Sequence, residues 1–109
     1  MGIYERKQRE KELRRVQIIE AARKVFSTKG FNTATMEEIA AQAELSPGTL
    51  YLYFKNKEEL HTSLSIQLIE HLAQEVKKVV AKDISVEEKL DQLKPVFIEV
   101  YEYDAMILI

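Results

Sequence analysis

The sequence of 109 residues contains no cysteine and no tryptophan, and it has only three glycines and two prolines. The absence of cysteine excludes disulfide bonds, thiolate metal clusters and a cysteine nucleophile. The scarcity of glycine and proline leaves few places for turns, and no stretch alternates apolar and polar residues convincingly over the length of a strand. The sequence therefore predicts an all-α protein.

Long apolar runs are also missing. With 46% hydrophobic and 31% charged residues, the chain is too apolar for a disordered protein and too charged for a membrane protein. Even the uncharged run from Leu60 to Ile69 is too short to span a bilayer. The N-terminus is charged, unlike the apolar core of a signal peptide, so the location we expect is the cytoplasm.

Charge is unevenly distributed along the chain. A formal net charge of −2 argues at first against a nucleic-acid partner, because binding to phosphates requires clustered Lys and Arg. Residues 1–57, however, hold 11 basic and seven acidic side chains, whereas residues 58–109 hold five basic and 11 acidic ones. This division predicts a basic half that binds a partner and an acidic half with a different task.

The predicted first helix covers roughly residues 5–29. It ends at Gly30, a residue type that closes helices in a left-handed conformation. A capping box formed by Thr35 and Glu38 then opens a short helix over residues 36–43. Apolar residues recur at helical spacing along the first helix and predict its buried face. They are Leu13, Val16, Ile19, Ala22, Val25 and Phe26.

A third helix of about two turns begins with Ser46 as its N-cap and Pro47 in its first position, and is expected to end at Tyr53 or Phe54. Two short helices joined by a turn at residues 44–45 have the dimensions of a helix-turn-helix. In that motif the first helix braces against the DNA backbone and the second offers its N-terminal residues to the major groove. Judged by spacing alone, an ordinary helical domain with a tight turn is an equal alternative.

Asn56 predicts the start of a long fourth helix that ends near Lys82. A second capping box, at Ser85, opens a fifth helix, which Pro95 is expected to kink. The last residues, 106–109, form an apolar run without a partner in so small a domain, so we expect the sequence to be cut from a larger protein. The predicted inward faces are Leu60, Leu64, Leu68, Leu72, Val76 and Val79 or Val80 in the fourth helix, and Leu90, Leu93, Phe97, Val100 and Tyr101 in the fifth.

Two motifs carry a family resemblance. Residues 30–40 read GFNTATMEEIA, and residues 45–60 read LSPGTLYLYFKNKEEL. In this order and at this separation, they closely resemble the DNA-binding domain of the tetracycline-repressor (TetR) family of bacterial transcriptional regulators. The resemblance implies a homeodomain-like three-helix DNA-binding domain in residues 1–57. Residues 58–109 would then be the first part of a helical domain for ligand binding and dimerisation.

The resemblance also implies roles for single residues. In the family, the residue at the position of Tyr51 faces the DNA. The residue at the position of Tyr53 commonly hydrogen-bonds a phosphate, and the lysine at the position of Lys57 contacts a phosphate. In the first turn of the third helix, Gly48 permits close approach and Thr49 touches base edges. Without the motif, residues 51–54 would be an aromatic core patch and the lysines a solvated turn. The expected DNA-binding residues are Thr35, Ser46, Gly48, Thr49, Tyr51, Tyr53 and Lys57.

Two residues depart from the family pattern. Glu44 stands where the family often has glycine, so either the turn avoids a left-handed residue or Glu44 is strained. Pro47 replaces a polar or basic residue that reads bases, so specificity is expected to rest on Thr49, Tyr51 and a basic arm. The arm, residues 3–15, interleaves six basic with three acidic side chains. It either follows the DNA backbone towards the minor groove or is a solvated helix with internal salt links.

No residues for catalysis are apparent, so we expect neither an enzyme nor a bound cofactor. His61 and His71 are ten residues apart, which favours ordinary surface histidines over a metal site. The resemblance implies a ligand-responsive repressor that binds a palindromic operator in double-stranded DNA. For the full-length protein it implies a homodimer and a small-molecule inducer. The alternative is a helical protein-interaction module that has lost DNA binding, which Glu44, Pro47 and the acidic balance would favour.

Overall fold

The computed structural model describes the backbone of residues 2–108 and the side chains of residues 2–102. The apolar run that we predicted at residues 106–109 therefore lies outside the described side chains. Within the described chain there are five helices and no strand, which confirms the all-α prediction. The helices are α1 (Gly2–Lys29), α2 (Met36–Gln42), α3 (Pro47–Tyr51), α4 (Lys57–Val80) and α5 (Val86–Leu108).

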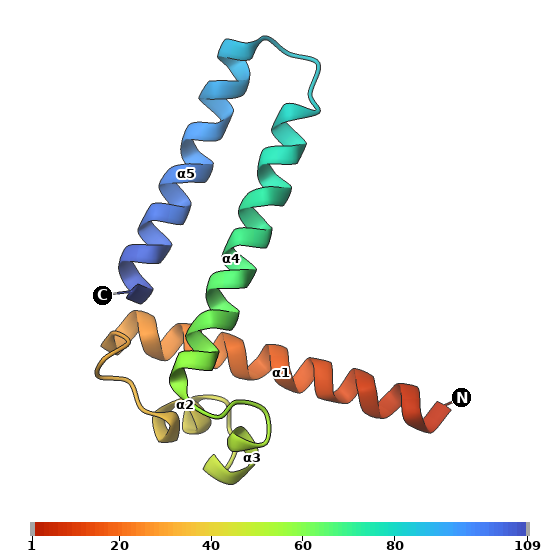
Figure 1. Ribbon diagram of the computed structural model, residues 1–109, viewed down its shortest axis with the longest axis vertical. Helices are drawn as coiled ribbons and strands as arrows, with labels where there is room; N and C mark the ends of the chain where they lie inside the picture. Colours follow the sequence, from red (N-terminus) through yellow and green to blue (C-terminus); the bar gives the residue numbers. More distant parts are fainter. Residues whose placement is uncertain (1, 109) are drawn as a thin grey trace.

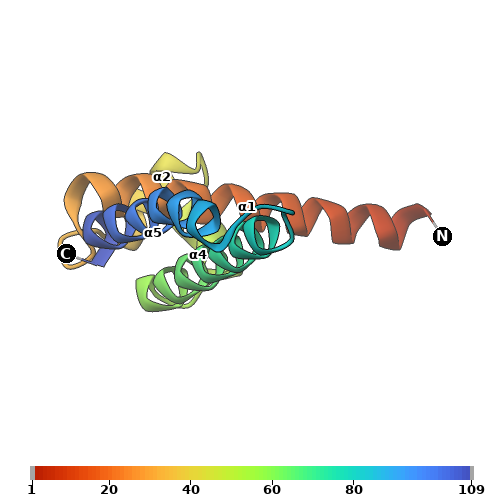
Figure 2. The same ribbon diagram turned by 90° about the horizontal axis from the view of Figure 1, so that it is seen from above.

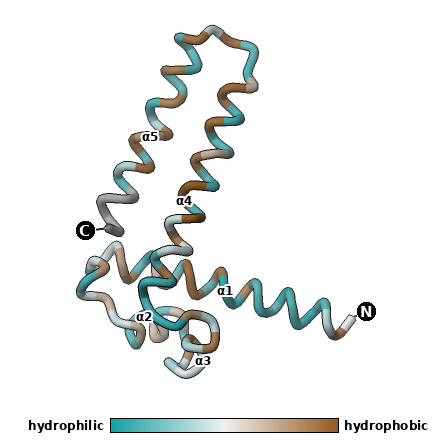
Figure 3. Tube along the Cα trace, viewed as in Figure 1, coloured by the Kyte–Doolittle hydropathy of each residue, from teal (hydrophilic) through white to brown (hydrophobic). Residues whose placement is uncertain are grey.

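The five helices form a head, made of α1 from Ile18 onwards, α2, α3 and the beginning of α4 up to Leu64, and a hairpin, made of the rest of α4 and α5. In Figure 1, α2 and α3 lie below α1, while α4 begins beside them, crosses α1 and rises above it, where it forms an antiparallel pair with α5. The N-terminal half of α1 extends beyond the other helices, and Figure 2 shows the same extension from above. Figure 3 shows that this extended part is mostly hydrophilic. The described helices include none that is both long and apolar enough to cross a membrane.

The predicted caps account for the helix starts in the head. Gly30 ends α1 with a φ of 81°, and its N–H donates to the carbonyl of Phe26 at 2.8 Å. At the start of α2, the Thr35 hydroxyl accepts from the Glu38 N–H at 3.2 Å, and the Glu38 carboxylate accepts from the Thr35 N–H at 3.2 Å. This reciprocal capping box confirms the prediction made from the sequence.

The third helix is shorter than predicted. It ends at Tyr51, with Leu52 as its C-cap, rather than at Tyr53 or Phe54. Both the Tyr53 and the Phe54 N–H groups donate to the carbonyl of Leu50, at 2.9 and 3.1 Å. The chain turns here, and Phe54, which is 2% exposed, reaches the core. Tertiary packing has therefore overridden the local helical pattern.

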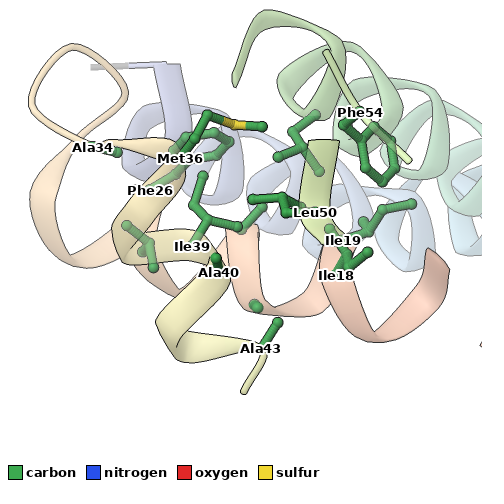
Figure 4. Packing of buried hydrophobic residues seen from close by; sticks show 14 of the residues in the cluster. Ile18, Ile19, Phe26, Ala34, Met36, Ile39, Ala40, Ala43, Leu50 and Phe54 are labelled. Carbon is green, nitrogen blue, oxygen red and sulfur yellow. The ribbon is translucent and has the colours of Figure 1, made fainter. Parts of the chain in front are cut away.

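One hydrophobic core joins α1, α2, α3 and the beginning of α4, and Figure 4 shows its side chains facing one another. Leu13 and Val16 do not belong to it, because they lie on the extended part of α1. Their exposed fractions are 70% and 56%, so their prediction as inward residues is wrong. The core residues are Ile18, Ile19, Ala21, Ala22, Val25, Phe26, Ala34, Met36, Ile39, Ala40, Ala43, Leu50, Phe54, Leu60 and Leu64.

The α4–α5 hairpin buries much less. Of the described side chains after Leu64, Val79 alone is buried. The predicted inward residues of α4 between these two are partly buried, as are Leu93 and Val100 of α5. The predictions for Leu90, Phe97 and Tyr101 are wrong: these side chains are 57%, 51% and 75% exposed.

Pro95 does not end α5, which continues through it as one helix. The missing N–H of a proline and the clash of its ring with the preceding turn favour bending rather than termination when the flanking residues are held in a helix. The kink expected at this residue stays a prediction. At the start of α5, the Ser85 hydroxyl accepts from the Glu88 N–H at 3.1 Å, which confirms one of the two hydrogen bonds of the predicted capping box.

Candidate DNA-binding surface

The turn between α2 and α3 resolves the alternatives for Glu44. This residue has a φ of 59°, in the left-handed region that glycine occupies without strain. Its N–H donates to the Ala41 carbonyl at 3.1 Å, and the Leu45 N–H donates to the Ala40 carbonyl at 2.9 Å. These two bonds form a Schellman motif, which closes α2 with its last carbonyls satisfied. Glu44 therefore has a strained backbone conformation in a turn whose hydrogen bonds are satisfied.

The turn and α3 are anchored from several sides. The side-chain amide of Gln17, on α1, donates to the Ala43 carbonyl in the turn at 2.9 Å. On the inner side of α3, Leu50 is completely buried, as Figure 4 shows. The outer side carries the side chains of Pro47 and Tyr51, which are exposed. The helix is therefore fixed through its inner face while its outer face remains open.

The hydroxyl groups of Ser46 and Thr49 are hydrogen-bonded to each other. The Ser46 hydroxyl caps α3 by accepting from the Thr49 N–H at 3.2 Å, and it donates its own proton to the Thr49 hydroxyl at 3.0 Å. The Thr49 hydroxyl is thereby left with one proton to donate elsewhere. The proton of Ser46 is already in use, whereas that of Thr49 remains available at the N-terminal end of α3.

Packing within the chain does not require glycine at position 48. A Cβ atom placed there would meet no atom closer than the Ser46 Oγ at 4.0 Å. Gly48 lies in the first turn of α3 and is exposed. A side chain here would interfere only with a molecule that approaches from outside, which agrees with a role in close approach to DNA.

The two tyrosines have different surroundings, as their spacing predicts. Tyr51 is 47% exposed on α3, whereas Tyr53 is partly buried and packs against the core. Leu52 between them is 83% exposed. Together with Lys11 and Arg15 of α1, Leu52 and Tyr53 line a groove between the basic arm and the end of α3. Sequence reasoning did not single out Leu52, because a leucine in a helical pattern indicates a core position.

The basic arm is helical and its side chains are exposed. Among the described residues, the ion pairs include none between side chains of residues 2–16. The internal salt links of the solvated-helix alternative are therefore not formed. The guanidinium of Arg15 lies 4.7 Å from the centroid of the Phe54 ring, so this end of the arm is fixed to the core by a cation–π contact.

Two further expected contact residues, Thr35 and Lys57, also form hydrogen bonds within the chain. The Thr35 hydroxyl donates to the Glu38 carboxylate at 3.0 Å and accepts from the Glu38 N–H. The ammonium of Lys57 donates to the carbonyl oxygens of Phe31, Asn32 and Ala34 at 2.7, 3.0 and 3.1 Å. An ammonium has three protons, and all of them are used here. In the structure the Lys57 ammonium is therefore bound by backbone carbonyls, and the phosphate contact that the resemblance implies stays a prediction.

The two histidines lie apart from each other and from the arm. His61 packs against Phe31, with ring centroids 5.1 Å apart. The Nε2 atom of His71 lies 3.8 Å from the Glu99 carboxylate, across the α4–α5 hairpin. In the part of the chain that the structure describes, no three potential ligand residues cluster in a way that could hold a metal ion.

Comparison with known proteins gives matches over the head of the molecule. The family model described as "Bacterial regulatory proteins, tetR family" matches residues 18–64. The "Fatty acid metabolism regulator protein" of Bacillus subtilis is 41% identical over 73 residues, which are 62% of this chain and 38% of the relative. The "HTH-type transcriptional regulator UidR" of Escherichia coli is 43% identical over 53 residues, which are 49% of this chain and 27% of the relative.

Solved structures give the same result over a longer part of the chain. A TetR-like transcriptional regulator from Rhodococcus sp. RHA1 is 30% identical with a TM-score of 0.74, over 87% of this chain and 54% of that one. The fatty acid degradation regulator FadR from Bacillus halodurans is 33% identical with a TM-score of 0.65, over 85% of this chain and 49% of that one. The chain spans about half the length of these structures and less of the two relatives above.

The motif order, the helix-turn-helix geometry and the matches agree over the same residues. One of the two relatives is named as a regulator of fatty acid metabolism and the other as an HTH-type transcriptional regulator. Residues 18–64 are therefore similar in sequence and fold to the DNA-binding part of the tetR family of bacterial regulatory proteins.

Proposed function

We propose that this chain is the DNA-binding part of a transcriptional regulator, in which α3 enters the major groove. The observation that carries this proposal is the open outer face of α3, held from behind by Leu50 and by the bond from Gln17 to the turn. A rigid, outward-facing second helix is what a helix-turn-helix requires, because its N-terminal residues must reach the base edges. The exposed basic arm beside it supplies the cations for phosphates.

The contacts are divided between base edges and backbone. The free proton of the Thr49 hydroxyl and the methyl group of the same residue suit base edges in the major groove. Gly48 lets the backbone of α3 approach closely, and Tyr51 lies on the same exposed surface. Tyr53, beside the arm, suits the phosphate backbone, which positions the protein without reading sequence. Ser46, whose proton is donated to Thr49, supports these contacts by capping α3. Thr35 supports these contacts by capping α2.

We also propose how the two parts of the chain divide the work. Residues 1–57 form the DNA-binding domain, and residues 58–109 belong to a helical domain for ligand binding and dimerisation. The complete regulator would be a homodimeric repressor that binds a palindromic operator and releases it when a small molecule binds. Matched proteins from Bacillus subtilis and Bacillus halodurans are named as regulators of fatty acid metabolism or degradation. Genes of fatty acid metabolism are therefore the first place to search for its operator.

The proposal is tested by DNA binding in two steps. The chain is first titrated against random duplex DNA over a series of salt concentrations, and its preferred site is then selected from a pool of random duplexes. Affinity should fall steeply with salt, with a slope set by the number of phosphates neutralised. Binding to random DNA that is absent even at low salt would contradict the proposal and favour the protein-interaction module.

Two variants then test the division of contacts. Thr49→Ala should cost about 1–3 kcal/mol on the selected site and little on random DNA. Tyr53→Phe, which removes one hydroxyl, should weaken binding to both DNAs alike. Thr33→Ala is the matched control, because Thr33 is exposed in the turn before α2 and is not one of the proposed contact residues. Equal losses for Thr49→Ala on both DNAs would show that Thr49 does not read bases.

A further inference from the structure

Lys57 connects the first turn of α4 to the segment that leads into α2. Its ammonium donates to three carbonyl oxygens, those of Phe31, Asn32 and Ala34, at 2.7, 3.0 and 3.1 Å. The same nitrogen lies 4.7 Å from the centroid of the Phe31 ring. All three carbonyls belong to the connection between α1 and α2, residues 30–35, which we call the α1–α2 connection.

The α1–α2 connection is shaped so that its carbonyls converge. The Ala34 N–H donates to the Gly30 carbonyl at 3.1 Å, which closes the connection on itself. Carbonyl oxygens that point at one spot repel one another unless a cation lies between them, and a compact ammonium with three protons matches three such acceptors. Lys57 thus stabilises the conformation of the α1–α2 connection. It also holds this connection next to the start of α4.

A second contact from α4 reaches the same place. His61, one turn after Lys57, packs against the Phe31 ring at 5.1 Å and against Phe26 at 6.3 Å, and the two phenylalanine rings are 5.4 Å apart. The start of α4 therefore holds Phe31 from two successive turns. Because Phe26 belongs to the buried core of α1, this aromatic cluster extends from the core to the start of α4.

The contacts of Lys57 have a consequence for the helix-turn-helix. The α1–α2 connection ends at Thr35, the N-cap of α2, and α2 is bonded to the turn before α3. We propose that Lys57 is a positioning residue: it holds the start of α4 against the α1–α2 connection and so fixes where α2 and α3 sit relative to α4. Its effect on DNA affinity, which rests on the proposed function, then acts through geometry and not through a phosphate contact.

The chain offers a matched control two residues away. Lys55 is exposed, and within the described residues its side chain makes no hydrogen bond or ion pair. The backbone N–H of Lys55 donates to the Glu59 carboxylate at 2.8 Å. Lys55→Met and Lys57→Met remove the same charge from nearly the same place. A difference between the two variants therefore reports the three carbonyl bonds.

The first measurement needs no DNA. Lys57→Met should lower the midpoint of thermal unfolding by about 4–8 °C, and Lys55→Met should leave it unchanged. Below these midpoints, Lys57→Met should also shift the amide NMR signals of residues 31–45, which Lys55→Met should not. Lys57→Arg should resemble Lys57→Met, because a planar guanidinium cannot direct its protons at three converging carbonyls. A wild-type midpoint and wild-type amide signals in Lys57→Met would overturn the proposal.

The second measurement separates positioning from a phosphate contact and from mere stability. Binding to random duplex DNA is measured against salt at a temperature where every variant is fully folded. Lys57→Met should bind more weakly than Lys55→Met, with a salt slope equal to that of the wild-type chain. A slope smaller in magnitude than the wild-type slope by about 0.9 would mean that Lys57 contacts a phosphate. Equal affinities would mean that Lys57 only stabilises the fold. Either result overturns the proposal.

The two proposals fail in different ways. If the wild-type chain does not retain DNA at low salt, the proposed function is wrong. The unfolding midpoints and the amide signals then still decide whether Lys57 places α2 and α3 relative to α4.

Discussion

The head, residues 18–64, and the hairpin, residues 65–102, are both helical but bury their apolar side chains very differently. The core of the head begins at Ile18 and ends at Leu64, which are also the limits of the family match. In the described part of the hairpin Val79 alone is buried, and an apolar groove on α5 is lined by residues such as Leu93 and Phe97. The comparison teaches that the part of the chain matched by the family model has its own hydrophobic core, whereas helix formation in the hairpin brings little burial.

The largest expected difference concerns aromatic residues of the two regions. Phe26 is completely buried in the head, and Phe97 is 51% exposed in the hairpin. Phe26→Ala should lower the free energy of unfolding by about 3–5 kcal/mol, because it removes a fully packed ring. Phe97→Ala should lower it by less than about 1 kcal/mol. Urea unfolding followed by circular dichroism measures both.

A milder core variant keeps the prediction testable if Phe26→Ala does not fold. Ile39 is also completely buried, and Ile39→Val should cost about 0.5–1.5 kcal/mol. If Phe97→Ala were as destabilising as Phe26→Ala, or Ile39→Val had no effect, the contrast between head and hairpin would be wrong.

Helix caps sharpen the same comparison at a smaller scale. Thr35 caps α2 in the head, and Ser85 caps α5 in the hairpin, each by accepting an N–H three residues later. Thr35→Ala should lower the free energy of unfolding by about 1 kcal/mol. Ser85→Ala should affect mainly local opening of α5, which amide hydrogen exchange detects. Thr33→Ala controls for the loss of a threonine hydroxyl near α2, and a global loss equal to that of Thr35→Ala in Ser85→Ala would contradict the prediction.

The strained turn of the head gives the next effect, of opposite sign. Glu44 has a φ of 59°, and Glu44→Gly should stabilise the chain by about 0.5–1 kcal/mol, after the greater entropy loss of glycine is subtracted. Glu44→Gln keeps a side chain in the same conformation and should leave stability nearly unchanged. The midpoint of urea unfolding distinguishes them. Destabilisation by Glu44→Gly would mean that the side chain of Glu44 makes a contribution of its own.

The smallest effect is a pH dependence shared by both regions. The hydrogen bond from Arg23 lowers the pKa of Glu20 in the head, and that from Lys78 lowers the pKa of Glu75 in the hairpin, in both cases from 4.5. A lowered pKa in the folded state stabilises the fold at pH values above 4.5, and this stabilisation is lost as the pH falls through the folded-state pKa. Both carboxylates are largely solvated, so the changes are small.

Glutamine variants measure this pH dependence. Glu20→Gln should have a slightly lower unfolding midpoint than the wild type at neutral pH, and the same midpoint once the wild-type carboxylate is protonated. Glu75→Gln should show the same pattern with an even smaller amplitude in global unfolding, since the hairpin buries little. A difference that grows as the pH falls would contradict the sign worked out above.

Local signals predicted the elements of the head well, and they failed where the outcome depends on distant parts of the chain. The capping residues Thr35 and Ser46 and the closing Gly30 act on their own neighbours, so the sequence is sufficient to place them. Periodicity placed Leu13 on an inward face, but it cannot tell how far the partner helices reach along α1.

The site shows the same limit. The motif located the helix-turn-helix, and the unusual Glu44 was recognised as a residue that either avoids or bears strain. The use of the Lys57 ammonium could not be predicted, because its three acceptors lie more than 20 residues away in the chain. A lysine at a helix start is solvent-exposed by default, and only the folded α1–α2 connection offers it carbonyls.

The basic arm and the core-packed part of α1 belong to one continuous helix, so a small tilt of the helix moves the tip of the arm by a large distance. Gln17 marks the point where α1 is bonded to the turn before α3, and the arm extends from there to Gly2, about 22 Å at the usual rise per residue. A tilt of about 10° at this fulcrum would move the tip by roughly 4 Å, more than the length of a hydrogen bond. The position of the arm's tip therefore depends on how tightly the core packs around the rest of α1. Loosening this packing would spread the tip over a wider range of positions before any helix unfolds.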